Sequence, residues 1–316
     1  MPHALVTGAA GFIGSTLADR LLADGVRVTG VDAFTDYYDP SLKRRNVAGA
    51  LEHRLFELLE LDLATADLAR LPEVDVVFHQ AAQPGVRESW GREFAAYTQN
   101  NVLATQRLLE RYKTSRLERF VFASSSSVYG DAESYPTHES MLPRPFSPYG
   151  VSKLAGEHLA FLYGRNFGLS VTSLRYFTVY GPRQRPDMAF HRFCRALLAG
   201  EPIIVYGDGH QSRDFTYVSD AVEANLRAWK RAAPQAVYNV GGGSQVEVLD
   251  AIAILEKNLG AKARVNLEPR PAGDPLRTRA DVRRLAADLG YATTVAIAEG
   301  LAAEAEWARS LYGGVR

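Results

Sequence analysis

A tyrosine and a lysine four residues apart are the residues of this sequence best suited to proton transfer. Tyr149 and Lys153 lie in SPYGVSKLAGEHLAF, whose spacing predicts the start of a helix, so both side chains fall on one face. A tyrosine with a pKa of about 10 is a poor base at neutral pH, but a nearby ammonium group stabilises the phenolate and lowers that pKa. The pair is therefore a candidate base for a hydroxyl proton. Outside a dinucleotide-binding fold, a chance pair on a surface helix is the better interpretation.

Four consecutive serines precede this pair in the chain. They lie in FASSSSVYG, residues 122–130, directly after an apolar run that predicts a strand. Binding sites in open α/β sheets lie at the carboxyl ends of the strands, so one of these hydroxyls could hydrogen-bond the reacting oxygen beside Tyr149. A serine-rich loop without a catalytic role is the alternative.

Three glycines near the N-terminus predict a dinucleotide site. Gly8, Gly11 and Gly14 follow the first apolar run, ALVTG, and open the first helical pattern. A turn without Cβ atoms lets a pyrophosphate approach backbone amides at the positive end of a helix. Asp32 ends the second apolar run, VRVTGVD, 18 residues after Gly14, at the spacing typical of an acid that binds the ribose hydroxyls. Its charge would repel a 2′-phosphate, which favours NAD over NADP.

Two further features near the dinucleotide site leave alternatives open. Lys43, Arg44 and Arg45 follow Asp32 closely, and such cations would suit the additional phosphate of NADP. Asp62, after the third apolar run LELDL, could accept a hydrogen bond from the adenine amino group, but it could equally be a helix N-cap.

The alternation of strands and helical patterns predicts an α/β fold with a Rossmann-type, doubly wound parallel sheet. Its strands are ALVTG, VRVTGVD, VDVVFHQ, RFVFASS and SVTSLRYF, with a weaker one near RLFELLELDL. After residue 176 the loops become rich in Gly, Pro and Arg. We expect an NAD-binding domain of residues 1–176 plus about 216–241, where AVYNVG predicts a further strand. A smaller C-terminal substrate-binding lobe is expected from residues 177–215 plus 242–316.

Composition narrows the class of protein. The 316 residues include 36 basic and 36 acidic side chains, so a nucleic-acid partner is not expected. Cys194 is the single cysteine, which excludes an internal disulfide and suits a reducing compartment. No apolar run reaches the roughly 18 residues of a membrane span, and the N-terminus lacks the pattern of a signal peptide. We expect a cytoplasmic protein without a metal site.

Five motifs, TGAAGFIG, FASSSSVYG, YGVSK, RYFTVYGP and GDGHQSRDFTYV, occur in this order along nearly the whole chain. Together they resemble the extended short-chain dehydrogenase/reductases, specifically the NAD-dependent sugar-nucleotide epimerases. The resemblance implies Ser125 as the catalytic hydroxyl, Tyr149 as the base and Lys153 as its helper. It also implies tightly bound NAD that is recycled each turnover, a UDP-sugar substrate and a transient 4-keto sugar.

The motifs and the resemblance together give two expected sets of binding residues. The cofactor set is Gly8, Gly11, Phe12, Ile13, Gly14, Asp32, Asp62, Leu63, Gln80, Asn101, Lys153 and Tyr176. The substrate set is Arg87, Ser125, Ser126, Ser127, Tyr149, Thr178, Arg185, Arg213, Asp274 and Arg277. In the second set, the resemblance implies a nucleotide contact for Arg213 and a diphosphate contact for Arg277 or, less favoured, Asp274.

The pocket residues favour one member of this family. Related 4,6-dehydratases carry an Asp-Glu pair after the catalytic hydroxyl, where this chain has Ser126 and Ser127, so dehydration is disfavoured. FTDYYDPSLKRRN, QAAQPGVRES and FTVYGPRQRPDM are similar to bacterial UDP-glucuronic acid 4-epimerases. A uronate carries a carboxylate, and we expect Thr178 and Arg185 to bind it. Arg87 could assist, although PGVRES departs from the commoner AGVRYS.

Three other functions stay open at this point. A UDP-glucose 4-epimerase would use the same catalytic groups with a different pocket. A UDP-glucuronate decarboxylase would let the 4-keto intermediate lose CO₂. A non-catalytic dinucleotide-binding regulator would need the glycine turn but not the catalytic residues.

A homodimer is implied by the resemblance alone. In the family, helices matching residues 93–113 and 148–167 form a four-helix contact between subunits. Both carry apolar stripes here, although packing inside one subunit would produce the same stripes. The residues of the stripes are Phe94, Tyr97, Leu108, Leu154, Leu159 and Leu162.

Overall fold

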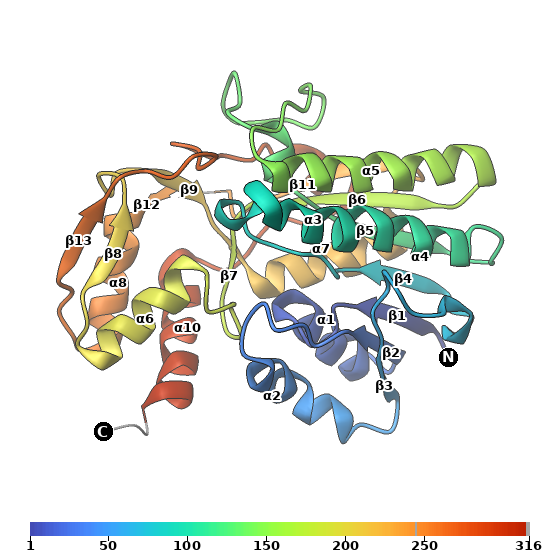
Figure 1. The fold of residues 1–316 in the computed structure, drawn as a ribbon, viewed down its shortest axis with the longest axis horizontal. Coiled ribbons are helices and arrows are strands. Elements are labelled where there is room, and N and C mark those ends of the chain that lie inside the picture. Colours follow the sequence, from blue (N-terminus) through green and yellow to red (C-terminus); the bar gives the residue numbers. More distant parts are fainter. Residues whose placement is uncertain (244, 314–316) are drawn as a thin grey trace.

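A seven-stranded parallel sheet forms the centre of the computed structural model, which describes residues 1–243 and 245–313 (Figure 1). Its strands are β1 (His3–Thr7), β2 (Arg27–Asp32), β3 (Phe56–Glu60), β4 (Val76–His79), β5 (Arg119–Ser125), β6 (Val171–Tyr176) and β11 (Ala236–Val240). Their order across the sheet is β11–β6–β5–β4–β1–β2–β3, and all neighbours run parallel. The order reverses beside β1, so the predicted doubly wound sheet is confirmed.

Helices cover both faces of this sheet, and each face has its own apolar core. On one face, α1 (Phe12–Ala23), α2 (Pro40–Leu51), α7 (Val218–Arg231) and α9 (Arg283–Leu289) contribute to the first core. On the other face, α4 (Ala104–Tyr112) and α5 (Pro148–Phe167) form the second core with the alternate residues of the same strands. Strands buried on both faces need apolar residues throughout, which is why these runs do not alternate with polar residues.

The helix expected at residues 93–113 is divided. A 3₁₀ turn (Gly91–Glu93) and α3 (Phe94–Tyr97) lead into a π-helical segment (Thr98–Leu103), and only then does α4 begin. Further 3₁₀ turns lie at Leu68–Arg70, Arg87–Ser89 and Ser126–Tyr129. Because π turns contain an extra residue, they rotate the side chains beyond them and commonly occur at functional sites.

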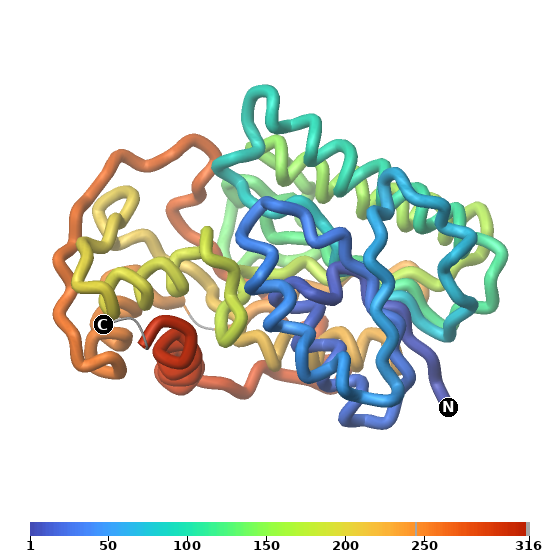
Figure 2. Tube along the Cα trace, turned by 60° about the horizontal axis from the view of Figure 1, so that its bottom comes forward, coloured from blue at the N-terminus to red at the C-terminus, as the bar shows by residue number. Residues whose placement is uncertain are grey.

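The remaining elements form a third apolar core beside the sheet. They are β7 (Val179–Tyr180), α6 (Ala189–Ala199), β8 (Ile203–Tyr206), β9 (Ser212–Asp214), β10 (Thr216–Tyr217), β12 (Gln245–Glu247), α8 (Val248–Leu259), β13 (Val265–Glu268) and α10 (Ile297–Tyr312). The strands pair as β7–β10, β9–β12 and β8–β13. The C-terminal helix α10 lies against α6 and α8, as Figure 1 and Figure 2 show.

The expected division into two domains stays a proposal, and the position of α9 changes one of its boundaries. Leu285 and Leu289 of α9 belong to the same apolar core as β1 and α1. They lie within residues 242–316, which the division assigns wholly to the substrate-binding lobe. We therefore place α9 with the NAD-binding domain in that proposal.

Two features bear on the class of protein. No helix in the described part of the chain is long and apolar enough to cross a bilayer. The Cys194 thiol is buried in α6, as its helical pattern predicts, and this burial raises its pKa. The thiol is therefore a neutral, packed side chain near pH 7.

Candidate active site

A cleft of about 1200 Å³ opens at the carboxyl ends of the central strands. It runs from the turn after β1 to the loop that carries Arg185. Thirteen of the expected site residues line it: Gly8, Gly11, Phe12, Ile13, Gly14, Asp32, Asp62, Leu63, Gln80, Tyr149, Lys153, Tyr176 and Arg185. Residues from the whole length of the NAD-binding segment and beyond it therefore meet at one cavity.

The glycine turn fits a pyrophosphate. Gly8 has a φ of +67°, and a Cβ at this position would lie 2.9 Å from the backbone nitrogen of Ala81. A Cβ on Gly14 would overlap the carbonyl oxygen of Gly8. Helix α1 begins just beyond Gly11, where no side chain caps its first amides. The turn thus keeps a close approach to free amides at a positive helix end, which suits an anionic group.

Asp32 lies at the end of β2 and lines the same cleft. Its carboxylate accepts hydrogen bonds from the backbone amides of Ala10 (3.0 Å) and Phe34 (2.8 Å). These bonds fix the carboxylate at the strand end, and a carboxylate has acceptor sites left for two ribose hydroxyls. The arrangement agrees with the expected role of this residue.

The three cations that follow Asp32 have separate positions. Lys43 lines the cleft, but its ammonium group donates to the carbonyl (2.8 Å) and the hydroxyl (3.1 Å) of Thr35. Arg44 pairs with Glu60, and Arg45 reaches the carbonyl of Ser310 at 3.4 Å. Of these three cations, Lys43 alone lines the cleft, and it is already bonded, which favours NAD over NADP.

Asp62 caps a turn rather than a helix, since the next helical element is capped by Asp67, and its expected adenine contact stays a prediction. Its oxygens accept from the backbone amide of Ala64 (2.8 Å) and the hydroxyl of Thr65 (3.0 Å), as a capping residue does. The same residue also lines the cleft, next to Leu63. The turn after β3 therefore presents a fixed carboxylate to the adenine end.

Tyr176 and Gln80 are held by a residue that was not predicted from the sequence. Asn225 of α7 donates to the Tyr176 hydroxyl (2.7 Å) and accepts from the Gln80 amide (2.9 Å). Tyr176 in turn donates to the Gln80 carbonyl group at 3.2 Å. This closed set of three side chains fixes the floor of the cleft, and nothing in the helical pattern of α7 distinguishes Asn225 from a surface amide.

The Asn101 side chain is buried beside the cleft and does not line it, and its expected cofactor contact stays a prediction. Asn101 is 1% exposed, and its amide nitrogen donates to Ser152 (2.9 Å) and to the Gln83 carbonyl (3.0 Å). Its oxygen accepts from the Gln83 backbone amide at 2.6 Å. Asn100 and Gln83 line the cleft instead. The π-helical segment rotates Asn101 into the wall, where it joins the loop after β4 to α5.

Tyr149, Lys153 and Ser125 form the centre of the site. Tyr149 and Lys153 both line the cleft, one helical turn apart on α5. Burial of the phenol raises the pKa of Tyr149, and a hydrogen bond with Ser125 and the charge of Arg185 oppose this rise. Burial lowers the pKa of Lys153 to about 8, and Glu157 opposes that shift. Arg185 is thus a cation that acts on the Tyr149 pKa and that the sequence did not predict in this role, while the helper role of Lys153 stays a prediction.

A buried ion pair lies behind Lys153. Glu157 accepts from both Nη2 (2.5 Å) and Nε (3.1 Å) of Arg175, and also from the Ser173 hydroxyl at 2.8 Å. Arg175 further donates to the Tyr129 hydroxyl at 2.8 Å. A fully bonded ion pair of this kind can be buried without an unpaired charge, and it fixes the part of α5 that carries Lys153.

At the other end of the cleft, Arg185 has a partner that the sequence did not predict. Its Nε and Nη2 atoms donate to the two oxygens of Asp187 at 3.0 and 2.9 Å. The two side chains are 20% and 26% exposed. Tyr37 and Tyr38, from FTDYYDP, line the cleft beside them, and the Tyr37 hydroxyl lies 3.5 Å from Asp187. The guanidinium is therefore held from one side and faces the cleft with the other.

Thr178, Ser126 and Ser127 do not line the cleft. Thr178 is half-buried between β6 and β7, and its carbonyl accepts from the Thr216 amide at 2.9 Å. Ser126 and Ser127 form the 3₁₀ turn after β5, where the Ser127 amide donates to Ser125 Oγ at 3.1 Å. Ser124, which was not singled out, lines the cleft instead. Ser125 does not line the cleft either, so the hydroxyls expected at the substrate lie next to the cavity, and their substrate contacts stay predictions.

Two of the expected substrate residues, Arg87 and Arg213, meet at a third, Asp274. Arg87 donates to one oxygen of Asp274 at 3.1 Å, and Arg213 donates to the other at 2.8 Å. The Arg87 guanidinium also lies 4.2 Å from the centre of the Tyr206 ring. Arg277 contributes its carbonyl to the Tyr135 hydroxyl at 3.0 Å, beside β9. Two cations and one anion give this cluster a net positive charge, and neither these three residues nor Arg277 line the cleft.

Among residues 1–243 and 245–313, no group of three or more side chains gathers that could hold a metal ion.

Comparison with known proteins identifies the class. Residues 4–241 match the NAD dependent epimerase/dehydratase family, and the chain belongs to this family. The uncharacterised UDP-glucose epimerase YtcB of Bacillus subtilis is 44% identical over 98% of this chain and 99% of its own. A crystal structure of UDP-glucuronic acid 4-epimerase from Bacillus cereus, in complex with UDP-glucuronic acid and NAD, has a TM-score of 0.95. It is 44% identical and covers 98% of this chain and 100% of its own.

A third relative has been solved with two different sugars. MoeE5 in complex with UDP-glucuronic acid and NAD has a TM-score of 0.88 and 43% identity, over 98% of this chain and 99% of its own. The same protein has been solved with UDP-glucose and NAD. The expected family and fold are confirmed by these matches, while the names of the relatives include both a charged and a neutral sugar.

Proposed function

We propose that this protein is an NAD-dependent UDP-glucuronate 4-epimerase, an isomerase that forms UDP-galacturonate. The observation that carries the proposal is the position of Arg185, a cation at the sugar end of the cleft whose charge acts on Tyr149. A neutral hexose gives no reason for a guanidinium at this place, whereas a uronate presents a carboxylate to it. The solved complexes of relatives with UDP-glucuronic acid and NAD support the same substrate and cofactor.

In this proposal the glycine turn, Asp32 and Lys153 hold NAD. Gly8 and Gly14 leave room for the pyrophosphate, Asp32 accepts from the ribose, and Lys153 lies at the nicotinamide end. When bound, NAD supplies reversible oxidation at C4 and a positive ring that lowers the pKa of the nearby phenol.

The proton is handled by Tyr149 and Ser125. Tyr149 takes the proton of the 4-hydroxyl group as the 4-keto sugar forms, and it returns the proton when the opposite face is reduced. Ser125, which acts to lower the pKa of Tyr149, is proposed to hold the same sugar oxygen in place. The low pKa of Lys153, about 8, still leaves it mostly charged at neutral pH, where it stabilises the phenolate.

Arg185 binds the uronate carboxylate with the part of its guanidinium that Asp187 leaves free. Asp187 occupies Nε and one hydrogen of Nη2, so Nη1 and the second Nη2 hydrogen remain available. A carboxylate held there has a fixed direction relative to the C4 carbonyl of the intermediate. Loss of CO₂ requires the C5–C6 bond to align with that carbonyl, so a fixed carboxylate favours epimerisation over decarboxylation.

The cluster of Arg87, Arg213 and Asp274 is proposed to bind the diphosphate. Its net positive charge complements two phosphates, and Asp274 keeps both arginines extended toward one point. Arg277, on the same segment, is a further candidate for this end of the site, while Thr178, Ser126 and Ser127 remain candidates for the sugar.

UDP-glucose 4-epimerase is the second candidate, and one observation favours it. Asp187 already neutralises much of the Arg185 charge, so the cleft would not strongly repel a neutral sugar. A relative named as a UDP-glucose epimerase is as similar to this chain as the Bacillus cereus enzyme. A UDP-glucuronate decarboxylase would need the sugar carboxylate to rotate freely. The guanidinium of Arg185, held in place by Asp187, would instead fix that carboxylate.

A homodimer is also proposed, through α5 and the segment before α4. Leu103, Val151, Leu162 and Phe167 expose about half of their side chains. Tyr97 is buried within the subunit, so interior packing accounts for part of the expected stripes, as it does for Leu108. The exposed apolar residues support a subunit contact, which sedimentation at two protein concentrations would test. A cytoplasmic location stays a prediction of the sequence.

The experiment that tests the function uses purified protein without added NAD. It is incubated separately with UDP-glucuronate, UDP-glucose and UDP-xylose, and the nucleotide sugars are then separated. The proposal predicts UDP-galacturonate from UDP-glucuronate without release of CO₂. Formation of UDP-galactose from UDP-glucose, with no turnover of UDP-glucuronate, would refute it.

A further inference from the structure

We infer that Glu304 and Tyr312, on the C-terminal helix α10, are positioning residues for Arg185. They hold the two ends of the turn formed by residues 181–184, which leads directly into Arg185. This inference rests on the proposed function, in which Arg185 binds the sugar carboxylate. It assigns to α10, a helix that does not line the cleft, a part in the choice of substrate.

Glu304 holds the first end of the turn. Its side chain is fully buried, and one oxygen accepts from the backbone amide of Gly181 at 3.0 Å. The other oxygen has no hydrogen-bond partner among the described residues. A carboxylate in such a place would be an uncompensated buried charge, and burial accordingly raises the pKa of Glu304 well above its ordinary value.

The groups around Glu304 agree with a neutral carboxyl group. Tyr180 of β7, Cys194 of α6 and Tyr217 of β10 face it, and burial raises the pKa of each. All three are uncharged near pH 7. Glu304 therefore acts as a neutral hydrogen-bond acceptor, and a glutamine could replace it.

Tyr312 holds the second end of the turn through His191. The Nδ1 atom of His191 lies 2.5 Å from the carbonyl oxygen of Gln184, and its Nε2 atom lies 2.6 Å from the Tyr312 hydroxyl. A carbonyl only accepts, so Nδ1 carries the hydrogen and Nε2 accepts from Tyr312. Burial lowers the pKa of His191, in keeping with this neutral form. Gln184 also accepts from the His191 amide at 2.9 Å through its side chain.

The turn itself has little freedom between these two ends. The Gln184 amide donates to the Gly181 carbonyl at 3.0 Å, and Arg183 adopts a φ of +72°. Arg183 pairs with Asp19 of α1 at 2.7 Å. A residue that follows such a turn inherits its direction from the turn, so a shift at either end moves the Arg185 backbone. Displacements near 1 Å are enough to reduce catalysis strongly.

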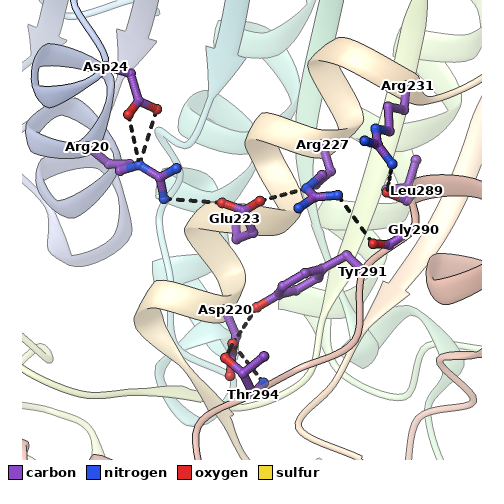
Figure 3. Close-up of polar contacts among 10 residues, drawn as sticks. All are labelled: Arg20, Asp24, Asp220, Glu223, Arg227, Arg231, Leu289, Gly290, Tyr291 and Thr294. Atoms are coloured by element: carbon purple, nitrogen blue, oxygen red, sulfur yellow. Dashed lines mark hydrogen bonds and ion pairs between the residues drawn. The ribbon is translucent and has the colours of Figure 1, made fainter.

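The segment that precedes α10 is bonded to α7, as Figure 3 shows. Asp220 of α7 accepts from the hydroxyl of Tyr291 and from the amide (3.1 Å) and hydroxyl (3.2 Å) of Thr294. The Val295 amide donates to its other oxygen at 3.3 Å. These bonds anchor the segment just before α10. The helix therefore connects α7 to the Arg185 turn without touching the cleft.

The first experiment compares Glu304→Ala with Glu304→Gln and with Glu306→Ala. Glu306 lies on the solvent side of the same helix, where it pairs only with Arg309 among the described residues, so its loss should change no kinetic constant. We expect Glu304→Ala to raise KM for UDP-glucuronate about tenfold, with a smaller change for UDP-glucose and an unchanged NAD content. Glu304→Gln should keep the wild-type KM, since the amide oxygen accepts from Gly181 in the same way.

Tyr312→Phe covers the case in which Glu304→Ala fails to fold. It removes one hydroxyl without creating a cavity, and we expect KM for UDP-glucuronate to rise roughly threefold, as for one lost hydrogen bond. Folded variants that keep the wild-type KM and the wild-type preference for UDP-glucuronate would overturn the inference. If the wild-type protein does not convert UDP-glucuronate at all, the proposed function fails, which is a separate outcome.

A pH series tests the neutral state of Glu304. A carboxyl group with a raised pKa in the folded state favours folding below its unfolded pKa of about 4.3, and this advantage is lost as pH rises. Between pH 5 and 8 the Tm of wild-type protein should therefore fall relative to that of Glu304→Gln. A difference in Tm that stays constant over this range would contradict a buried, neutral acid.

Discussion

The two ends of the cleft are built in different ways. At the dinucleotide end, backbone amides of the glycine turn and the Asp32 carboxylate come from the first 32 residues, and the bonds that fix them are local. At the sugar end, Arg185 and Asp187 come from one loop and Tyr37 from a distant one, and the Arg87–Asp274 pair joins two more segments. The first end depends on the absence of side chains, and the second depends on paired charges. Binding at the cofactor end should therefore be lost when a side chain is added, and binding at the sugar end when a charged partner is removed.

The largest effect is expected where the two ends meet, at Tyr149. Tyr149→Phe removes the group that accepts and returns the proton, and we expect kcat for UDP-glucuronate to fall about a thousandfold. NAD content and binding of UDP-glucuronate should stay near wild type, since the phenyl ring remains in place. Product formation, the absorbance of extracted NAD and calorimetric titration would measure these three quantities. A variant with more than a tenth of the wild-type kcat would exclude Tyr149 as the base.

The next effect is expected at the cofactor end alone. In Gly14→Ala, the new Cβ would overlap the Gly8 carbonyl, and the strain of such overpacking corresponds to about a tenfold to hundredfold loss of NAD affinity. The purified variant should contain little NAD and should regain activity when NAD is added in excess. Gly49→Ala serves as a control, since that glycine lies in α2 with open space around it and does not line the cleft. Equal NAD contents in the two variants would argue against the close-packed turn.

The smallest effect is expected at the partner of Arg185. Asp187→Asn removes the charge that holds the guanidinium, and we expect KM for UDP-glucuronate to rise about fivefold, as for a weakened charge-assisted hydrogen bond. Asp24→Asn is the control, because it breaks an exposed ion pair with Arg20 away from the cleft, and its KM should change less than about twofold. A fall in KM for Asp187→Asn would instead show that Asp187 competes with the substrate for Arg185.

Much of the cofactor end could be predicted from the sequence because its determinants are local. The roles of Gly8, Gly14 and Asp32 depend on a strand, a turn and a helix that follow one another in the chain. The buried position of the Asn101 side chain could not be predicted in this way. No pattern in the sequence indicates the π-helical segment that carries it, or its hydrogen bond to Ser152.

The sugar end could be predicted only as a set of residue types. Arg185 was expected in the site and lines it, but Thr178 does not line it, and Asp187 was overlooked two residues further on. The meeting of Arg87 and Arg213 at Asp274 depends on how distant loops pack, which spacing does not encode. The burial of Glu304 could not be predicted either, because an acidic residue in an amphipathic helix is usually exposed to solvent.

The preference for a charged sugar through Arg185 is the central claim, and one ratio tests it most directly. It is kcat/KM for UDP-glucuronate divided by kcat/KM for UDP-glucose, measured for the wild-type protein and for Arg185→Ala. Loss of a charge-assisted bond to the carboxylate should lower this ratio by about 10- to 100-fold, with NAD content unchanged. A ratio that stays the same in Arg185→Ala would contradict the account and assign the choice of sugar to other residues.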